Sequence, residues 1–88
     1  MTKGIYLFKD IKLGEYEFYG VFVNDAVAIR AFKRACKDPN IFKDDIELYR
    51  SAAIDTRTGK IVVNDNNVGF GIEEPEYLMS GCDVNDEV

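Results

Sequence analysis

The chain contains no histidine and no tryptophan, and it has only two cysteines and two prolines in 88 residues. Without histidine, the Ser–His and Cys–His pairs of nucleophilic catalysis, histidine general bases and Cys/His zinc sites are all excluded. Cys36 and Cys82 lie far apart in a chain without a secretion signal, so we expect both thiols to be reduced. These absences favour a protein that is not an enzyme and that binds no cofactor or metal.

Long apolar runs are also missing, and nothing resembles a signal peptide or a transmembrane span. Only Lys3 precedes the short apolar run near the N-terminus, and no small-residue cleavage site follows that run. The length allows a single domain with a modest core. We therefore expect one cytoplasmic domain that makes no membrane contact.

Positive charge is absent from the last third of the chain. The net charge is −5, but all 11 lysines and arginines lie at or before Lys60. Residues 61–88 carry seven acids and no cation, whereas residues 1–60 carry 11 cations and nine acids. Such a charge-asymmetric chain with an acidic C-terminal part indicates an interaction function.

Residues 25–38 have the pattern of one amphipathic helix, around which the other segments are arranged. At ~100° per residue, its apolar face is formed by Ile29, Phe32 and Cys36. Nearly opposite, at spacings i, i+3, i+4 and i+7, stand four cations: Arg30, Lys33, Arg34 and Lys37. Asn24 and Asp25 provide an N-cap, and Pro39 ends the helix. One side of the helix is therefore predicted to be buried and the other to carry positive charge.

Strands are predicted on both sides of this helix. The apolar and β-branched runs are residues 3–9, 16–23, 46–54 and 60–63, with a possible fifth strand at 68–72. Asp55 and Gly59 fit a hairpin loop between the third and fourth runs. The pattern predicts an α+β fold in ββαββ order, a two-layer domain of residues 1–72 with one helix on an antiparallel sheet. Residues 73–88 are expected to form a poorly ordered acidic tail, with residues 77–79 as a possible docking patch.

Most aromatic side chains are expected in the core, because a small domain without tryptophan needs them there. In the second strand, alternation places Tyr16, Phe18 and Phe22 on one side and Glu17, Tyr19, Val21 and Val23 on the other. Tyr16 and Tyr19 are our candidates for stacking on unpaired bases. A single helix covers one face of the sheet, so we expect dimerisation or a ligand to cover the other. Ile41 and Phe42 are expected to anchor the loop after the helix onto the core.

Four segments together resemble a known family, in their order and spacing. They are Ala28–Phe32 (Ala-Ile-Arg-Ala-Phe), Asp38–Pro39, Asp45–Tyr49 (Asp-x-Glu-Leu-Tyr) and Asp55–Gly59 (Asp-x-x-Thr-Gly). This set is similar to the small non-structural protein of gokushovirus-type microviruses, which are single-stranded-DNA phages. The resemblance covers roughly residues 3–62. It implies a non-structural role in DNA binding or in the switch to single-stranded genome synthesis and packaging, without catalytic residues.

The row of helix cations allows two interpretations. One is an ordinary solvated helix face, which is where lysine and arginine usually lie. The other is a row of phosphate contacts that gives salt-sensitive, sequence-tolerant binding of DNA. One monomer with four contacts binds weakly, so a homodimer with two adjacent helices makes the second interpretation stronger. A magnesium cluster for a nuclease, from Asp44, Asp45, Glu47 and Asp55, is disfavoured because loop and hairpin roles explain these acids.

The acidic C-terminal part has three interpretations: it confers solubility, it folds back on the basic helix and competes with DNA, or it binds a basic partner as a DNA mimic does. We predict a non-enzymatic phage accessory protein of the host cytoplasm. It is expected to bind single-stranded DNA weakly in genome replication or packaging, as a homodimer. The alternative is an acidic protein–protein interaction module that acts on a phage or host replication or capsid protein.

Overall fold

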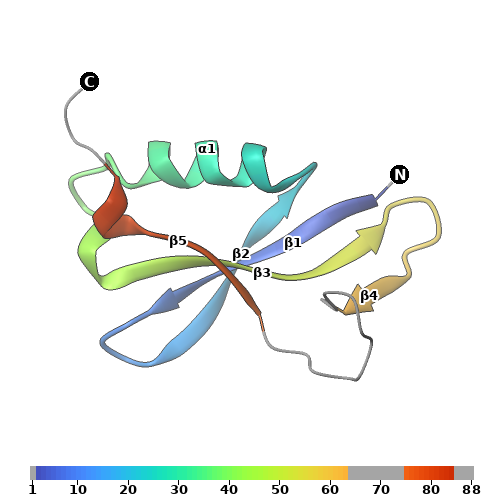
Figure 1. Cartoon of the computed structure of the whole chain (residues 1–88), viewed down its shortest axis with the longest axis horizontal. Coiled ribbons are helices and arrows are strands. Elements are labelled where there is room, and N and C mark those ends of the chain that lie inside the picture. The colour runs from blue at the N-terminus through green and yellow to red at the C-terminus, as the bar shows by residue number, and fades with distance from the viewer. Residues whose placement is uncertain (1, 64–74, 85–88) are drawn as a thin grey trace.

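The described residues of the computed structural model, 2–63 and 75–84, form five strands and one α-helix (Figure 1). Their order is β1 (Thr2–Asp10), β2 (Glu15–Phe22), α1 (Asp25–Ala35), β3 (Ile46–Asp55), β4 (Ile61–Val63) and β5 (Glu76–Ser80). Two single turns of 3₁₀ helix, η1 (Lys43–Asp45) and η2 (Gly81–Asp83), precede β3 and follow β5. The predicted α+β class and the order ββαββ are confirmed, with β5 added at the end.

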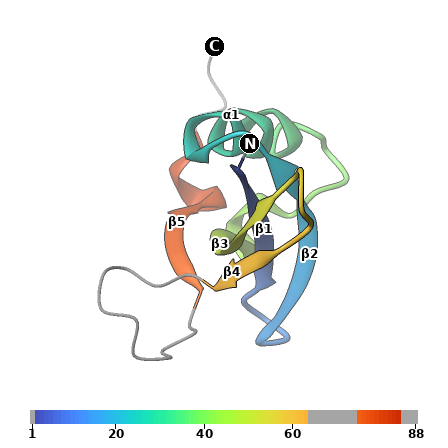
Figure 2. The ribbon, with the colours of Figure 1, turned by 90° about the vertical axis from the view of Figure 1, so that its right-hand side faces the viewer.

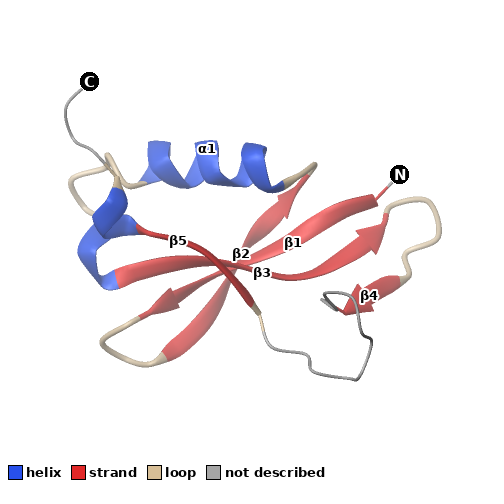
Figure 3. Ribbon diagram, viewed as in Figure 1, coloured by secondary structure: helices blue, strands red, loops and turns tan. Residues whose placement is uncertain are grey.

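All described strands pair antiparallel in one sheet, in the order β2-β1-β3-β4. β5 pairs with the first half of β3, residues 47–50, and β4 with the second half, residues 52–54. Gly59 closes the β3–β4 loop with a positive φ of 78°, a conformation that costs glycine little. The helix and the strands form the two expected layers (Figure 3).

The core lies between α1 and one face of the sheet (Figure 2). Asn24 caps α1 by accepting a hydrogen bond from the Val27 amide at 2.9 Å. The helix then buries positions four residues apart, so one stripe faces the strands. The buried cluster consists of Tyr6, Ala28, Phe32, Cys36, Leu48, Met79 and Val84. Phe32 and Cys36 are therefore buried as predicted, and Ile29 packs against the cluster's edge.

The expectation of a poorly ordered tail from residue 73 does not hold for residues 76–84. Met79 on β5 is 8% exposed and Val84 is 4% exposed, both within the core cluster. Lys43 Nζ donates a hydrogen bond to the Val84 carbonyl oxygen at 2.7 Å. The apolar side chains and strand pairing of this segment outweigh its acidic composition. Residues 68–72, where a strand was predicted, and residues 85–88 lie outside the described part.

A β-bulge in β2 changes the predicted facing of its aromatic residues. Tyr6 pairs with Gly20 and Leu7 with Phe18, so Tyr19 is an extra residue in β2. Tyr19 and Phe22 both pack against the core under α1, whereas Tyr16 and Phe18 lie on the opposite face. The prediction that Phe22 shares a side with Tyr16 and Phe18 is wrong, because strict alternation assumes a strand without a bulge.

The loop after α1 also differs from the prediction. Ile41 and Phe42 were expected to anchor it onto the core, yet both side chains are exposed. The loop is instead fixed by backbone hydrogen bonds from Ile41 to Asp38 and from Asp45 to Phe42, both at 2.9 Å. Its shape is thus set by turns, and its apolar side chains remain at the surface.

Candidate nucleic-acid interface

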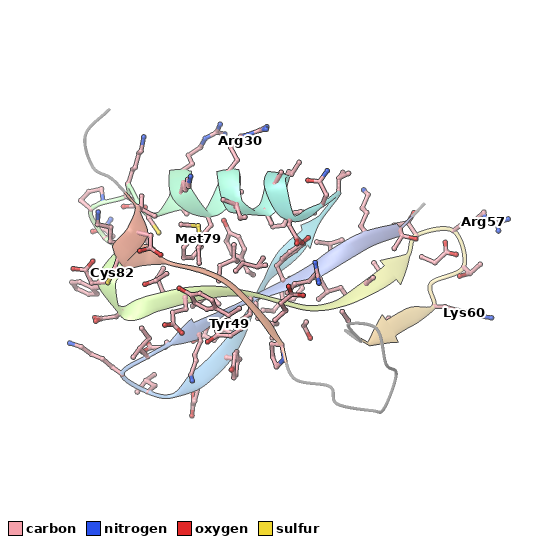
Figure 4. The ribbon with its side chains drawn as sticks, in the orientation of Figure 1. Arg30, Tyr49, Arg57, Lys60, Met79 and Cys82 are labelled. Atoms are coloured by element: carbon pink, nitrogen blue, oxygen red, sulfur yellow. The ribbon has the colours of Figure 1, made fainter. Side chains whose placement is uncertain are left out.

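The outer face of α1 carries Arg30, Lys33 and Arg34. The helix ends at Ala35, earlier than the predicted residue 38, so Lys37 lies in the turn that follows. All four side chains are exposed. Figure 4 shows Arg30 projecting from α1 away from the sheet. This direction follows from the buried stripe, because a helix that buries Ala28 and Phe32 points the positions opposite them outward. We refer to Arg30, Lys33, Arg34 and Lys37 as the cation row.

Within the described part of the chain, no member of the cation row makes an ion pair or a side-chain hydrogen bond. The one acid of α1, Asp25, is turned toward the sheet. Its two carboxylate oxygens accept hydrogen bonds from Tyr6 Oη and Arg50 Nη1, each at 2.7 Å. Arg50 also pairs with Glu76 on β5. Asp25 is therefore engaged by the fold, and Asp38, directly after Lys37, accepts a hydrogen bond from the Asn40 amide at 2.9 Å.

The two candidate stacking tyrosines do not lie beside the cation row. Tyr19 packs edge-on against Phe32 with ring centroids 6.3 Å apart, so it lies partly buried between α1 and β2 at the edge of the core. Burial raises the pKa of Tyr19, with a smaller contribution from Cys36. Tyr16 is exposed but lies on the face of the sheet that α1 does not cover. The predicted site thus divides into an exposed row of cations, a partly buried tyrosine under α1 and a tyrosine on the far face of the sheet.

An aromatic row crosses this uncovered face of the sheet. The rings of Tyr16 and Tyr49 lie 5.2 Å apart, and those of Tyr49 and Tyr77 lie 5.6 Å apart, both edge-to-face. Phe18, beside them on β2, is 65% exposed. Desolvation raises the pKa of Tyr49, and its 2.8 Å hydrogen bond to Glu47 raises that pKa further. We call this surface, with Tyr16, Phe18, Tyr49 and Tyr77, the open sheet face.

Sequence patterns predicted only part of the open sheet face. Tyr77 was assigned to the acidic tail, and its place beside Tyr49 depends on the β3–β5 register, which pairs these two residues directly. The Lys9 ammonium lies 5.4 Å from the centroid of the Tyr16 ring. Lys9 on β1 and Glu47 on β3 are neighbours in the strand register. The face therefore brings one cation and one acid together among aromatic side chains.

Two further exposed cations, Arg57 and Lys60, lie at the β3–β4 loop, at the opposite end of the sheet from the acidic loop 38–45 (Figure 4). Asp55 shapes this loop by accepting hydrogen bonds from the Arg57 and Thr58 amides at 2.9 and 3.4 Å. The hairpin role predicted for Asp55 is confirmed. The loop supplies a positive surface that is separate from the cation row.

The carboxylates considered for magnesium do not gather in the described residues. Asp45 pairs with Lys12 at 3.6 Å, Glu47 accepts from Tyr49, and Asp55 serves the hairpin loop. Residues 2–63 and 75–84 contain no group of three acids, cysteines or histidines placed to hold a metal ion. In the same residues, no helix is long and apolar enough to span a bilayer.

A comparison with protein families matches residues 3–84 to the family described as "Phage ORF5 protein". The match extends over both layers of the fold, including β5 and η2. No curated protein and no solved structure matches the chain.

Proposed function

Because the chain belongs to the Phage ORF5 protein family, we propose that it is a non-enzymatic phage accessory protein that binds single-stranded DNA through the cation row. The observation that carries this proposal is the exposure of four cations, on α1 and the turn after it, that have no ion-pair partner in the described residues. Such a surface attracts a polyanion without first having to break internal ion pairs. The host cytoplasm, during genome replication or packaging, is where this activity would be used.

The expected binding mode is weak and insensitive to base sequence. If each cation contacts one phosphate of a single strand, the logarithm of the association constant should fall against the logarithm of salt with a slope of about −3. Aromatic stacking is not expected to add to this affinity, because Tyr19 is packed under α1 and Tyr16 lies on the far face. The proposed site therefore consists of the cation row and does not include Tyr16 or Tyr19.

Fluorescence anisotropy of a labelled oligothymidine, titrated with protein at several salt concentrations, tests this proposal. We expect Arg30→Ala/Arg34→Ala to weaken binding about tenfold or more at low salt and to flatten the salt slope by about 1.4, half of its value. The matched control is Arg57→Ala/Lys60→Ala, which removes the same charge from the β3–β4 loop. Equal losses in both variants would show that only net charge matters and would contradict a specific role for the cation row.

A second function is favoured by the open sheet face, on which Phe18 is 65% and Tyr77 49% exposed. Aromatic surface of this kind is typical of protein–protein contacts. It supports the alternative of an interaction module that acts on a replication or capsid protein. Absence of DNA binding at low salt, in the full chain and in a chain ending at Val84, would favour this alternative. Truncation must stop there because Val84 belongs to the core.

A further inference from the structure

A pocket of about 590 Å³ opens at the end of the sheet where the β1–β2 turn meets the loop after α1. Its floor is aromatic: Phe8 and Phe32 both pack edge-on against Tyr19, with centroid distances of 6.3 Å. Leu13, from the β1–β2 turn, and Phe42, from the loop after α1, are the most exposed apolar residues of its lining, and we call the part that they form its mouth. The volume lies within the range of natural binding pockets, roughly 300–1,000 Å³, and the lining is mainly apolar, as in such pockets.

The mouth of this pocket exposes unusually large apolar side chains. Phe42 is 77% exposed and Leu13 67%, the two highest values among the large hydrophobic residues of the described chain. Ile11 and Ile41, close by in sequence, are exposed as well. Surface clusters of this kind mark interaction sites. An exposed ring therefore stands directly beside an apolar cavity in the same molecule.

We propose that this end of the protein is a homodimer interface in which Phe42 of each copy enters the pocket of the other. An isologous contact requires a surface that is complementary to itself around a two-fold axis. A projecting group next to a cavity meets that requirement, because each copy supplies one projection and receives one. A partner without a matching cavity would leave Phe42 exposed, so a second copy satisfies both features at once.

Charge and area agree with a second copy as the occupant. The rim carries Asp10, Asp45 and Lys12, of which Lys12 and Asp45 already pair at 3.6 Å. Around a two-fold axis, Lys12 of one copy can face Asp10 of the other, so the rim is complementary to itself. The exposed apolar residues of the lining, Leu13, Ile41 and Phe42, expose roughly 350 Å², under half of the ~800 Å² that each partner buries in a standard interface. We therefore expect a weak dimer, with a dissociation constant in the micromolar range.

The inference does not depend on DNA binding. The expected homodimer forms through the pocket end of the protein. The open sheet face, the other exposed apolar surface, takes no part in this contact. The floor of the pocket includes Phe32 of α1, and its wall includes Ala35 near the end of that helix. The interface therefore adjoins α1 on a flank that carries none of the cation row.

Sedimentation equilibrium of the full chain, over roughly micromolar to millimolar concentration, measures the dimer directly. We expect Phe42→Ser to raise the dissociation constant at least tenfold, with an unchanged circular dichroism spectrum because Phe42 is exposed. Phe18→Ser, a matched change on the open sheet face, should leave the dimer intact. A wild-type protein that is monomeric at millimolar concentration would overturn the proposal. So would a dimer weakened by Phe18→Ser and not by Phe42→Ser.

A mixing experiment tests the reciprocal contact itself. Ala35→Met fills the pocket but keeps Phe42, whereas Phe42→Ser keeps the pocket but removes the ring. Each variant alone should be monomeric, and their mixture should form heterodimers, visible by native mass spectrometry, because one of the two contacts remains. A mixture with no more dimer than either variant alone would overturn the exchange of Phe42 between copies.

Discussion

At the scale of single residues, helical periodicity predicted the cation row well and strand periodicity predicted the tyrosines poorly. The spacing of Arg30, Lys33 and Arg34 fixes their common direction once one helix face is buried. Lys37 lies in the turn after α1, beyond the reach of the helical period. The side of the sheet on which Tyr19 lies depends on a bulge in β2, opposite Tyr6 and Leu7 of β1. Gly20, directly after the extra residue, is a local signal for the bulge, because glycine inside a strand often marks one, but it does not specify the register.

One polar network links four elements around the start of α1. Tyr6 on β1 and Arg50 on β3 both donate to Asp25, and Arg50 also reaches Glu76 on β5. Burial raises the pKa of Tyr6 most, and its hydrogen bond to Asp25 raises that pKa further. Ionising this phenol would remove the donor that Asp25 accepts from. The network therefore makes stability sensitive to alkaline pH.

We predict that stability falls above pH ~10, the ordinary pKa of tyrosine. The folded protein holds the Tyr6 proton to higher pH than the unfolded chain does, so the unfolded state binds fewer protons in this range. The free energy of unfolding then decreases as pH rises toward the folded-state pKa, and the contribution is complete below pH ~10. Urea unfolding at neutral and alkaline pH measures this loss. Tyr6→Phe should lose less stability over the same interval, and an equal loss would contradict the assignment.

At the scale of elements, the amphipathic helix and the first four strands were predictable, whereas β5 was not. Local signals sufficed for α1, which has an N-cap, a 3.6-residue period and a proline after its end. The acidic composition around β5 suggested a tail. Its strand pairing with β3 and the burial of Met79 are contacts between distant segments, which composition does not reveal. Figure 4 shows Met79 between β5 and α1.

We predict that Met79→Ala lowers the free energy of unfolding by about 2–3 kcal/mol, because it leaves a cavity between α1 and the sheet. Ile61→Ala, a change at an exposed position of β4, should alter it by no more than about 0.5 kcal/mol. Urea unfolding followed by circular dichroism compares the two variants. If Met79→Ala were as mild as Ile61→Ala, β5 would not be part of the folding core.

At the scale of the whole molecule, three surfaces point in different directions. The cation row lies on the outer side of α1, the open sheet face lies on the other layer, and the pocket opens at the end of the sheet. The sequence predicted that both a basic face and an aromatic face exist. It did not predict which tyrosines lie on the uncovered face, because the bulge in β2 and the pairing of β5 with β3 are properties of the folded chain. DNA binding and dimerisation can therefore be tested with independent variants.

The net charge of −5 acts against DNA binding at the same scale. The protein extends over 39 × 25 × 19 Å. At low ionic strength, ~0.01 M, the Debye length is ~30 Å, so acids anywhere on the protein repel DNA bound at α1. At ~0.15 M it is ~8 Å, and only nearby charges remain effective. Asp86 and Glu87, near the C-terminus, belong to the part of the chain that has no cation.

We predict that Asp86→Asn/Glu87→Gln raises the affinity for oligothymidine a few-fold at low salt and that the gain vanishes near physiological salt. The reason is that the substitutions reduce long-range repulsion and add no contact. Asn85→Ala/Val88→Ala changes the same segment without changing its charge and should bind as the wild type does. A gain that persists at physiological salt would instead indicate that the acidic end competes directly with DNA for the cation row. No gain at low salt would show that the field of the whole protein does not oppose binding.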